Sequence, residues 1–172
     1  MRATRCAAAL AAACLLTIGL TGCPYGTSSG LPEHIRTVRV TTFENDTFYR
    51  GLEGRLTRAL IDKLVQDPRV RVVREGADSR LTGAIMEVEK QVLRESRNDE
   101  PIEIRLTVVA RVTFEDEVQG VKLLDNQRIH SSAASSAAGV YDLERGEDRS
   151  EAEAKAIEEL AAEIVRRTVG MW

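Results

Sequence analysis

One long stretch of alternating side chains constrains the fold of this chain more than any other feature. Between residues 102 and 115, apolar side chains occupy every even position, and mostly polar or charged side chains occupy the odd positions. The apolar set is Ile102, Ile104, Leu106, Val108, Ala110, Val112 and Phe114. Because successive side chains of a strand point to opposite faces, this period of two predicts a long strand with one buried face and one largely solvated face. Such strands are typical of antiparallel sheets.

Four further stretches predict the other strands of the sheet. They are rich in β-branched residues or alternate in polarity, and they cover residues 35–43, 69–73, 80–94 and 121–132. The segment SRNDEP at 96–101 contains the residue types of a hairpin loop. It joins the two longest strands, which are therefore expected to form an antiparallel hairpin. Gly120 marks the next turn.

An amphipathic helix is predicted after the first strand. Its apolar stripe recurs at intervals of four and consists of Leu52, Leu56, Leu60 and Leu64. The residues ahead of it that are typical of helix N-caps are Asn45, Asp46 and Thr47. Asp67-Pro68 is expected to end the helix, because the residue before a proline disfavours the helical conformation.

A second amphipathic helix is predicted at the end of the chain. Ser150 and Glu153 have the spacing of a capping box, and apolar residues then recur at helical spacing as far as Trp172. The order strand, helix, several strands, helix predicts an α+β fold. We expect a two-layer sandwich in which a mostly antiparallel sheet of four to five strands has both helices packed on one face. One parallel pairing is also allowed, if the first strand inserts beside a later one across the helix.

The N-terminal segment has the pattern of a secretory signal peptide. Arg2 and Arg5 precede an apolar run of about 15 residues, which is shorter than the roughly 20 residues of a membrane-spanning helix. A buried core helix is the alternative. The run ends in Leu20-Thr21-Gly22-Cys23, which resembles the lipobox of bacterial lipoproteins. By that resemblance Cys23 is lipidated and becomes the first residue after cleavage, rather than a core residue, a disulfide partner or a reactive thiol.

These features divide the chain into three parts: a removed signal peptide at 1–22, a lipidated tether at 23–33 and a single α+β domain at 34–172. From Cys23 onward the chain has 22 basic and 27 acidic residues, a net charge of −5. A nucleic-acid-binding domain requires a strong basic excess, so no nucleic acid is expected as a partner. Two or three acyl chains on Cys23 would hold the protein stably in a membrane.

The sequence contains no convincing catalytic or metal-binding constellation. The two histidines, His34 and His130, lack the spacing of a metal-binding pair, and no Gly-x-Ser-x-Gly elbow or Gly-rich phosphate loop is present. Glu87 and Glu89 share a strand face, as glycosidase carboxylates can, but a solvated strand explains them better. We therefore predict a non-catalytic protein with no metal and no cofactor; an unrecognised hydrolase is the minor alternative.

From Cys23 onward the sequence resembles the lipopolysaccharide-assembly lipoprotein family (LptE-like). The resemblance is spread over many positions, and the matching segments are 23–26, 31–35, 38–40, 43–48, 51–53, 56–60, 77–78, 81–83 and 164–172. It departs from the family pattern at Leu123-Leu124, where an aromatic residue is commonly found, and in the Ser/Ala run at 131–139.

The resemblance implies both a location and a partner. Family members are two-layer α+β lipoproteins on the periplasmic side of the outer membrane. They assist the assembly of a large β-barrel translocon, an LptD-like protein, and plug it, and lipopolysaccharide is implied as a further ligand. Pro24 also favours the outer membrane, because an Asp at this position favours retention in the inner membrane. The alternative is a lipid-anchored periplasmic regulator or adaptor of a cell-wall synthase or a secretion channel.

Three basic residues near the predicted hairpin loop are the candidate contacts for lipopolysaccharide: Lys90, Arg94 and Arg97. Arginine and lysine form charge-assisted hydrogen bonds with phosphate groups, which lipopolysaccharide contains. The alternative is a solvated loop whose basic charges are balanced by Glu95, Asp99 and Glu100.

Overall fold

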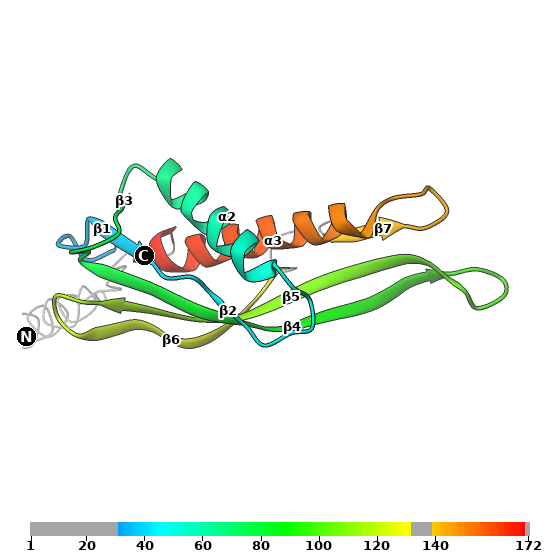
Figure 1. Cartoon of the computed structure of the whole chain (residues 1–172), viewed down its shortest axis with the longest axis horizontal. Coiled ribbons are helices and arrows are strands. Elements are labelled where there is room, and N and C mark those ends of the chain that lie inside the picture. The colour runs from blue at the N-terminus through cyan, green and yellow to red at the C-terminus, as the bar shows by residue number, and fades with distance from the viewer. Residues whose placement is uncertain (1–30, 132–138, 171–172) are drawn as a thin grey trace, which may run out of the picture.

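Two helices cover one face of a single twisted sheet (Figure 1). The computed structural model describes residues 31–131 and 139–170. The helical layer consists of α2 (Leu52–Gln66) and α3 (Arg149–Val165), and the π-helical segment η2 (Arg166–Gly170) continues α3. The predicted two-layer α+β architecture is confirmed. Cys23, the predicted signal peptide, most of the tether, most of the Ser/Ala run and Trp172 lie outside the described residues.

The sheet is mixed and has seven strands within the described residues. They are β1 (Thr37–Val40), β2 (Glu44–Asn45), β3 (Arg71–Val72), β4 (Ser79–Glu95), β5 (Pro101–Asp116), β6 (Val121–His130) and β7 (Val140–Asp142). The strand order is β3-β1-β4-β5-β6, with β2 beside β4 and β7 beside β5. Pairings among β4, β5, β6 and β7 are antiparallel, whereas β1–β3, β1–β4 and β2–β4 are parallel. The prediction of a mostly antiparallel sheet of four to five strands is corrected accordingly.

The predicted strand at 35–43 is shortened to β1, and the separate strand β2 follows just beyond it, which explains part of this correction. The chain keeps following β4 between them, because the backbone N–H of Thr41 donates to the carbonyl of Leu81. Phe43 then turns into the core, where it is 2% exposed, and its N–H donates to Thr57 Oγ1 of α2. Since α2 separates β1 from β3 and β4 in the chain, these strands can run parallel.

The short strand β7 is the second addition to the predicted sheet. It pairs with residues 103–105 of β5 and follows Gly139, whose φ of 68° favours glycine. The backbone N–H of Leu106 donates to the Gly139 carbonyl over 2.8 Å, and a side chain at position 139 would overlap the carbonyl of Leu106. Three residues are too few for alternation to predict a strand.

Both helices begin differently from the prediction. Gly51, with φ 81°, occupies the N-cap position of α2, and no side chain caps that helix. Asn45 instead holds the preceding loop: its Oδ1 accepts from the backbone N–H and hydroxyl of Thr47, and its Nδ2 donates to the carbonyl of Tyr49. The prediction of Asn45, Asp46 and Thr47 as helix caps is therefore wrong.

In α3 the cap is Asp148, which accepts hydrogen bonds from the backbone N–H and the hydroxyl of Ser150. The predicted capping box is therefore wrong. Glu153 instead forms ion pairs with Arg55 of α2 and Arg149, at 3.1 and 2.9 Å. The Glu153 carboxylate therefore links α3 to α2 and does not cap the first turn of α3.

The core lies between the helices and the sheet, as the two periodic patterns predict. The four leucines of α2 are each at most 1% exposed, and they form one cluster with Val108, Ala110, Val112 and Phe114 of β5. Ile157, Leu160 and Ile164 of α3 belong to the same cluster. The helix α2 also ends at Gln66, immediately before Asp67-Pro68, as predicted.

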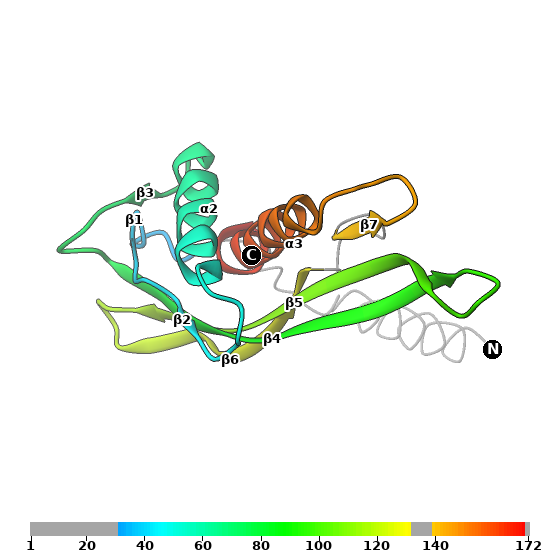
Figure 2. The same ribbon diagram turned by 45° about the vertical axis from the view of Figure 1, so that its right-hand side comes forward.

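The β4–β5 hairpin continues beyond the helical layer as a projecting arm (Figures 1 and 2). The two strands pair from Ser79–Asp116 as far as Glu95–Pro101. Every residue of β4 from Glu89 to Glu95 is exposed. The predicted hairpin and its loop are confirmed. In the arm the β4 strand is exposed, whereas the β5 strand is partly covered by β7.

Two aspartates attach the N-terminal end of the domain to the sheet. Asp116, only 1% exposed, accepts hydrogen bonds from His34 Nε2 at 2.6 Å and from the N–H groups of Val118 and Gln119. Burial alone would raise the pKa of Asp116, but these hydrogen bonds and the charge of His34 lower it below its ordinary value. Asp78 accepts from Thr37 and Arg36 in the same region. His34 is thus a structural partner of a carboxylate.

Candidate functional site

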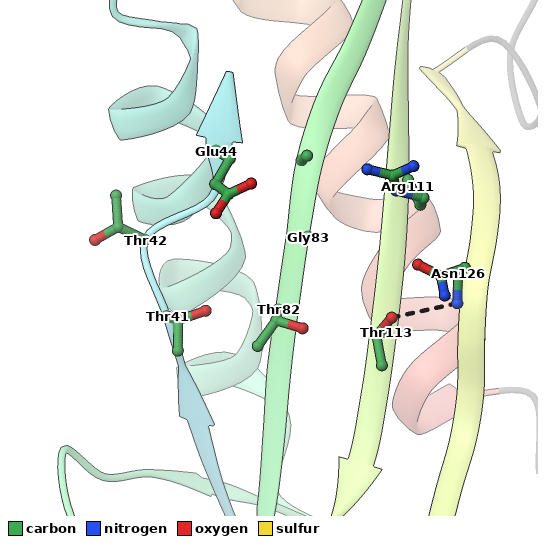
Figure 3. A pocket seen from close by; sticks show the side chains of 9 residues that line it. Thr41, Thr42, Glu44, Thr82, Gly83, Arg111, Thr113 and Asn126 are labelled. Atoms are coloured by element: carbon green, nitrogen blue, oxygen red, sulfur yellow. Dashed lines mark hydrogen bonds between the residues drawn. The ribbon is translucent and has the colours of Figure 1, made fainter. Parts of the chain in front are cut away.

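The sheet face opposite the helices contains a polar depression of about 360 Å³, here called the outer-face depression (Figure 3). Its lining residues are Thr41, Thr42, Glu44, Thr82, Gly83, Ala84, Arg111, Thr113 and Asn126. They come from the β1–β2 segment, β4, β5 and β6. In Figure 3 both helices lie behind the strands, so the labelled side chains of Thr82, Arg111 and Thr113 stand on the outer face.

The strand register places three of the lining side chains, and Arg128 beside them, in one row. Glu44 pairs with Ala84, Ala84 with Arg111, and Arg111 with Arg128, so the row crosses β2, β4, β5 and β6. Paired residues share a sheet face. The small side chain of Ala84 therefore separates a carboxylate on one side from two guanidinium groups on the other.

The neighbouring row supplies neutral polar groups. Thr82 of β4 pairs with Thr113 of β5, and the backbone N–H of Asn126 donates to Thr113 Oγ1 over 3.2 Å. Asn126 has φ 48° and lies where the register of β6 against β5 shifts, between the pairs at Val112 and Phe114. This bulge directs the Asn126 side chain into the depression, beside the hydroxyl of Thr113 (Figure 3).

Arg111 is the most unusual side chain of the central strand. It is the one exposed residue between Ile102 and Asp116 of β5. Its side chain makes no hydrogen bond or ion pair within the described part of the chain. Arg128 opposite it reaches Glu87 at 3.5 Å, and the side chains of this pair are 61% and 53% exposed. Two like charges directly opposite each other on adjacent strands destabilise a sheet.

Another row of the same face shows how this fold otherwise neutralises adjacent arginines. Arg39 of β1 pairs in register with Arg80 of β4. Glu117 binds both guanidinium groups, at 2.7 and 3.3 Å, and Glu115 binds Arg80 at 2.8 Å. The hydrogen bond and charge of Glu115, with the charge of Glu117, raise the pKa of Arg80 above its ordinary value. No comparable carboxylate contacts Arg111 among the residues that the structure describes.

The three predicted lipopolysaccharide contacts have different neighbours in the structure. Lys90 lies with its Nζ 5.8 Å from the ring centre of Tyr49, which Arg149 also approaches, at 4.8 Å. Arg94 forms ion pairs with Asp142 at 2.8 Å, Glu144 at 3.5 Å and Glu103 at 3.6 Å. Arg97 is exposed in the hairpin loop. Their role in lipopolysaccharide binding stays a prediction.

Arg94 has a clear structural function. Asp142 also accepts hydrogen bonds from the backbone N–H groups of Glu144 and Arg145. Burial would raise the pKa of Asp142, but those bonds and the charges of Arg94 and Arg145 lower it below its ordinary value. Arg94 therefore connects the projecting arm to the turn after β7. Around them lies a second open depression, of about 600 Å³, whose lining mixes both signs of charge.

The arrangement suits binding rather than catalysis. Among the described residues, no group of three or more His, Cys, Asp or Glu side chains could hold a metal ion. Glu87 is engaged with Arg128, and His130 pairs in register with Val109 in the sheet. No helix in the described ranges is long and apolar enough to cross a membrane. What the outer-face depression offers is a cation, a carboxylate and neutral hydrogen-bonding groups around a polar space.

Comparisons with known proteins identify a family and a shared fold. A family model described as LptE, lipopolysaccharide-assembly, matches residues 35–169. The hypothetical protein CT253 from Chlamydia trachomatis is similar in structure, with a TM-score of 0.53 and 12% identity over 80% of this chain and 97% of that chain. The uncharacterized lipoprotein B from Nitrosomonas europaea also has a TM-score of 0.53, with 16% identity over 82% of this chain and 85% of that chain. No curated protein matches the sequence.

Proposed function

This chain belongs to the LptE family of lipopolysaccharide-assembly proteins, and on that premise we propose that it plugs a β-barrel translocon of the outer membrane and assists the assembly of that barrel. The family is non-catalytic, so the chain is a lipopolysaccharide-assembly lipoprotein of the cell envelope and not an enzyme. The observation that carries the proposal is the extent of the family match, which covers α2, α3 and every described strand.

The surface of the domain supports this proposal. The lumen of a large outer-membrane barrel is polar and filled with water. The outer sheet face has rows of arginine, glutamate and threonine side chains, and its ion pairs are partly exposed. Such a face can lie against a wet lumen at little desolvation cost, because its polar groups stay in contact with water. The projecting arm gives the domain the reach to follow a barrel wall.

The predicted lipid anchor on Cys23 also supports the proposal. Lipidation of Cys23 places the domain at the periplasmic surface of the outer membrane, and residues between Cys23 and Leu31 connect it to the folded part. A domain held in this way meets an outer-membrane barrel at high effective concentration, because the tether confines it to the same surface.

Depletion of the chain from its own cells tests the proposed function. We expect lipopolysaccharide at the cell surface to fall, because a translocon that lacks its plug subunit does not assemble correctly. The measurement is labelling of intact cells with a lipopolysaccharide-binding probe that does not cross the outer membrane. Gel mobility of the unheated barrel, which distinguishes folded from unfolded barrels, gives a second readout.

Restoring the wild-type chain is the control, and it is expected to recover both readouts. Unchanged surface lipopolysaccharide, together with a defect in cell-wall synthesis or in secretion, would contradict the proposal. That result would indicate a lipid-anchored regulator of one of those systems.

A further inference from the structure

At one end of the outer-face depression stands Arg111, a guanidinium group without a counterion among the described residues, whereas Arg128 opposite it is paired with Glu87. Arg111 and Arg128 stand opposite each other on β5 and β6, and Arg111 has no partner for its side chain among residues 31–131 and 139–170. The row of Arg39 and Arg80 shows that this sheet places glutamates beside adjacent arginines when the requirement is structural. An anion from outside the chain would neutralise Arg111, as Glu87 neutralises Arg128 and as Glu115 and Glu117 neutralise the first row.

The rest of the depression restricts the chemistry of that anion. Glu44 lies across Ala84 from Arg111, so a ligand with negative charge at both ends would be repelled at one of them. A carboxylate accepts hydrogen bonds and therefore suits hydroxyl groups. Thr82, Thr113 and Asn126 add neutral groups that both donate and accept. The lining has no aromatic residue, so recognition depends on hydrogen bonds and charge.

A sugar that carries one phosphate matches these features. Arginine binds phosphate through charge-assisted, often bidentate hydrogen bonds, and threonine, asparagine and glutamate side chains bind sugar hydroxyls. The volume of about 360 Å³ falls within the range of small-ligand sites. We propose that the outer-face depression binds the phosphorylated sugar of lipopolysaccharide, with the phosphate at Arg111 and the sugar hydroxyls towards Glu44. The proposal rests on the proposed function, which brings the chain to lipopolysaccharide.

Four binding measurements on the full-length lipidated protein in detergent, two protein variants with two ligands, test the site. The wild type and Arg111→Gln are each titrated with lipopolysaccharide and with lipopolysaccharide whose phosphates have been removed. In the wild type, removal of the phosphates is expected to weaken binding about tenfold, the effect of losing a hydrogen bond between charged groups. Arg111→Gln is expected to weaken binding of the intact form by a similar factor and to make binding insensitive to the phosphates.

The matched control is Arg58→Gln, which removes the same charge from an exposed position on α2, in the layer on the other side of the sheet. It is expected to bind both forms as the wild type does. The melting temperature of each variant shows that it is folded. If Arg111→Gln keeps the full difference between the two forms, or if Arg58→Gln loses it equally, the proposed site is wrong.

Competition distinguishes a sugar phosphate from phosphate alone. Glucosamine 1-phosphate is expected to displace lipopolysaccharide at lower concentration than inorganic phosphate, and Glu44→Gln is expected to reduce that difference. Equal competition by the two compounds would contradict the role of Glu44 and the threonines.

The binding and depletion experiments separate the site from the proposed function. If depletion lowers surface lipopolysaccharide while Arg111→Gln binds normally, the proposed function stands and the site is rejected. If phosphate-dependent binding requires Arg111 but depletion leaves surface lipopolysaccharide unchanged, the site stands and the proposed function is rejected.

Discussion

Replacement of Cys23 with alanine is expected to release the protein from the membrane completely. The predicted lipobox Leu20-Thr21-Gly22-Cys23 would place the acyl chains on this residue. Each buried methylene group contributes about 0.8 kcal/mol, so two or more acyl chains attach a small domain stably to a membrane, whereas one chain binds only reversibly. The measurement is the share of the protein in the membrane pellet and in the soluble fraction after cell lysis.

A second cysteine of the same chain provides the control. Cys14 lies in the apolar run of the predicted signal peptide and would be removed before the protein matures. Cys14→Ala is therefore expected to leave both membrane attachment and metabolic labelling with palmitate unchanged, whereas Cys23→Ala loses both. Retention of Cys23→Ala in the membrane pellet, with its palmitate label, would show that the lipidated residue has been wrongly assigned.

Gly83→Ala is expected to destabilise the folded domain by about 1–3 kcal/mol, the range for overfilling a packed core. Gly83 lies in β4, where it pairs with Val112. An added Cβ would lie 2.5 Å from the carbonyl oxygen of Arg111 and 2.5 Å from Cε1 of Phe43. The first is backbone of the central strand and the second belongs to a side chain that is 2% exposed, so neither can move away freely. The measurement is the free energy of unfolding in urea.

The same change at Gly54 is the control. Gly54 lies inside α2, and a Cβ there would meet nothing within 4 Å. Alanine is a better helix former than glycine by about 0.8–1 kcal/mol, so Gly54→Ala is expected to raise the free energy of unfolding. Equal effects of the two substitutions would contradict the close approach of Phe43 and β5 to Gly83. Phe43→Leu in the Gly83→Ala background is expected to recover part of the loss.

Features that depend on short-range periodicity could be predicted from the sequence. The alternation along β5 and the leucine stripe of α2 each identified a buried face, because the period of a side-chain pattern is set by the local backbone geometry. The parallel strands could not be predicted in the same way. The pairings of β1 and β2 with β4 depend on contacts across α2, and β7 has only three residues.

The candidate site illustrates the same limit. Lys90, Arg94 and Arg97 are close in sequence, yet Arg94 is neutralised by Asp142, 48 residues away in the chain. Arg111 was not predicted, because its lack of a partner within the described residues is visible only when the register of β2, β4, β5 and β6 is known. The available signal was a single arginine at the centre of a strand whose other long charged side chains lie near its ends.

The central claim, that this lipoprotein is the plug subunit of a lipopolysaccharide translocon, is tested most directly by purification from its own envelope. The full-length lipidated chain is extracted in mild detergent and recovered by affinity, and the proteins that accompany it are identified and quantified by mass spectrometry. We predict a large outer-membrane β-barrel in stoichiometric amount. Recovery of a cell-wall synthase or a secretion-channel component in its place, without a barrel, would contradict the proposed function and leave only the family fold.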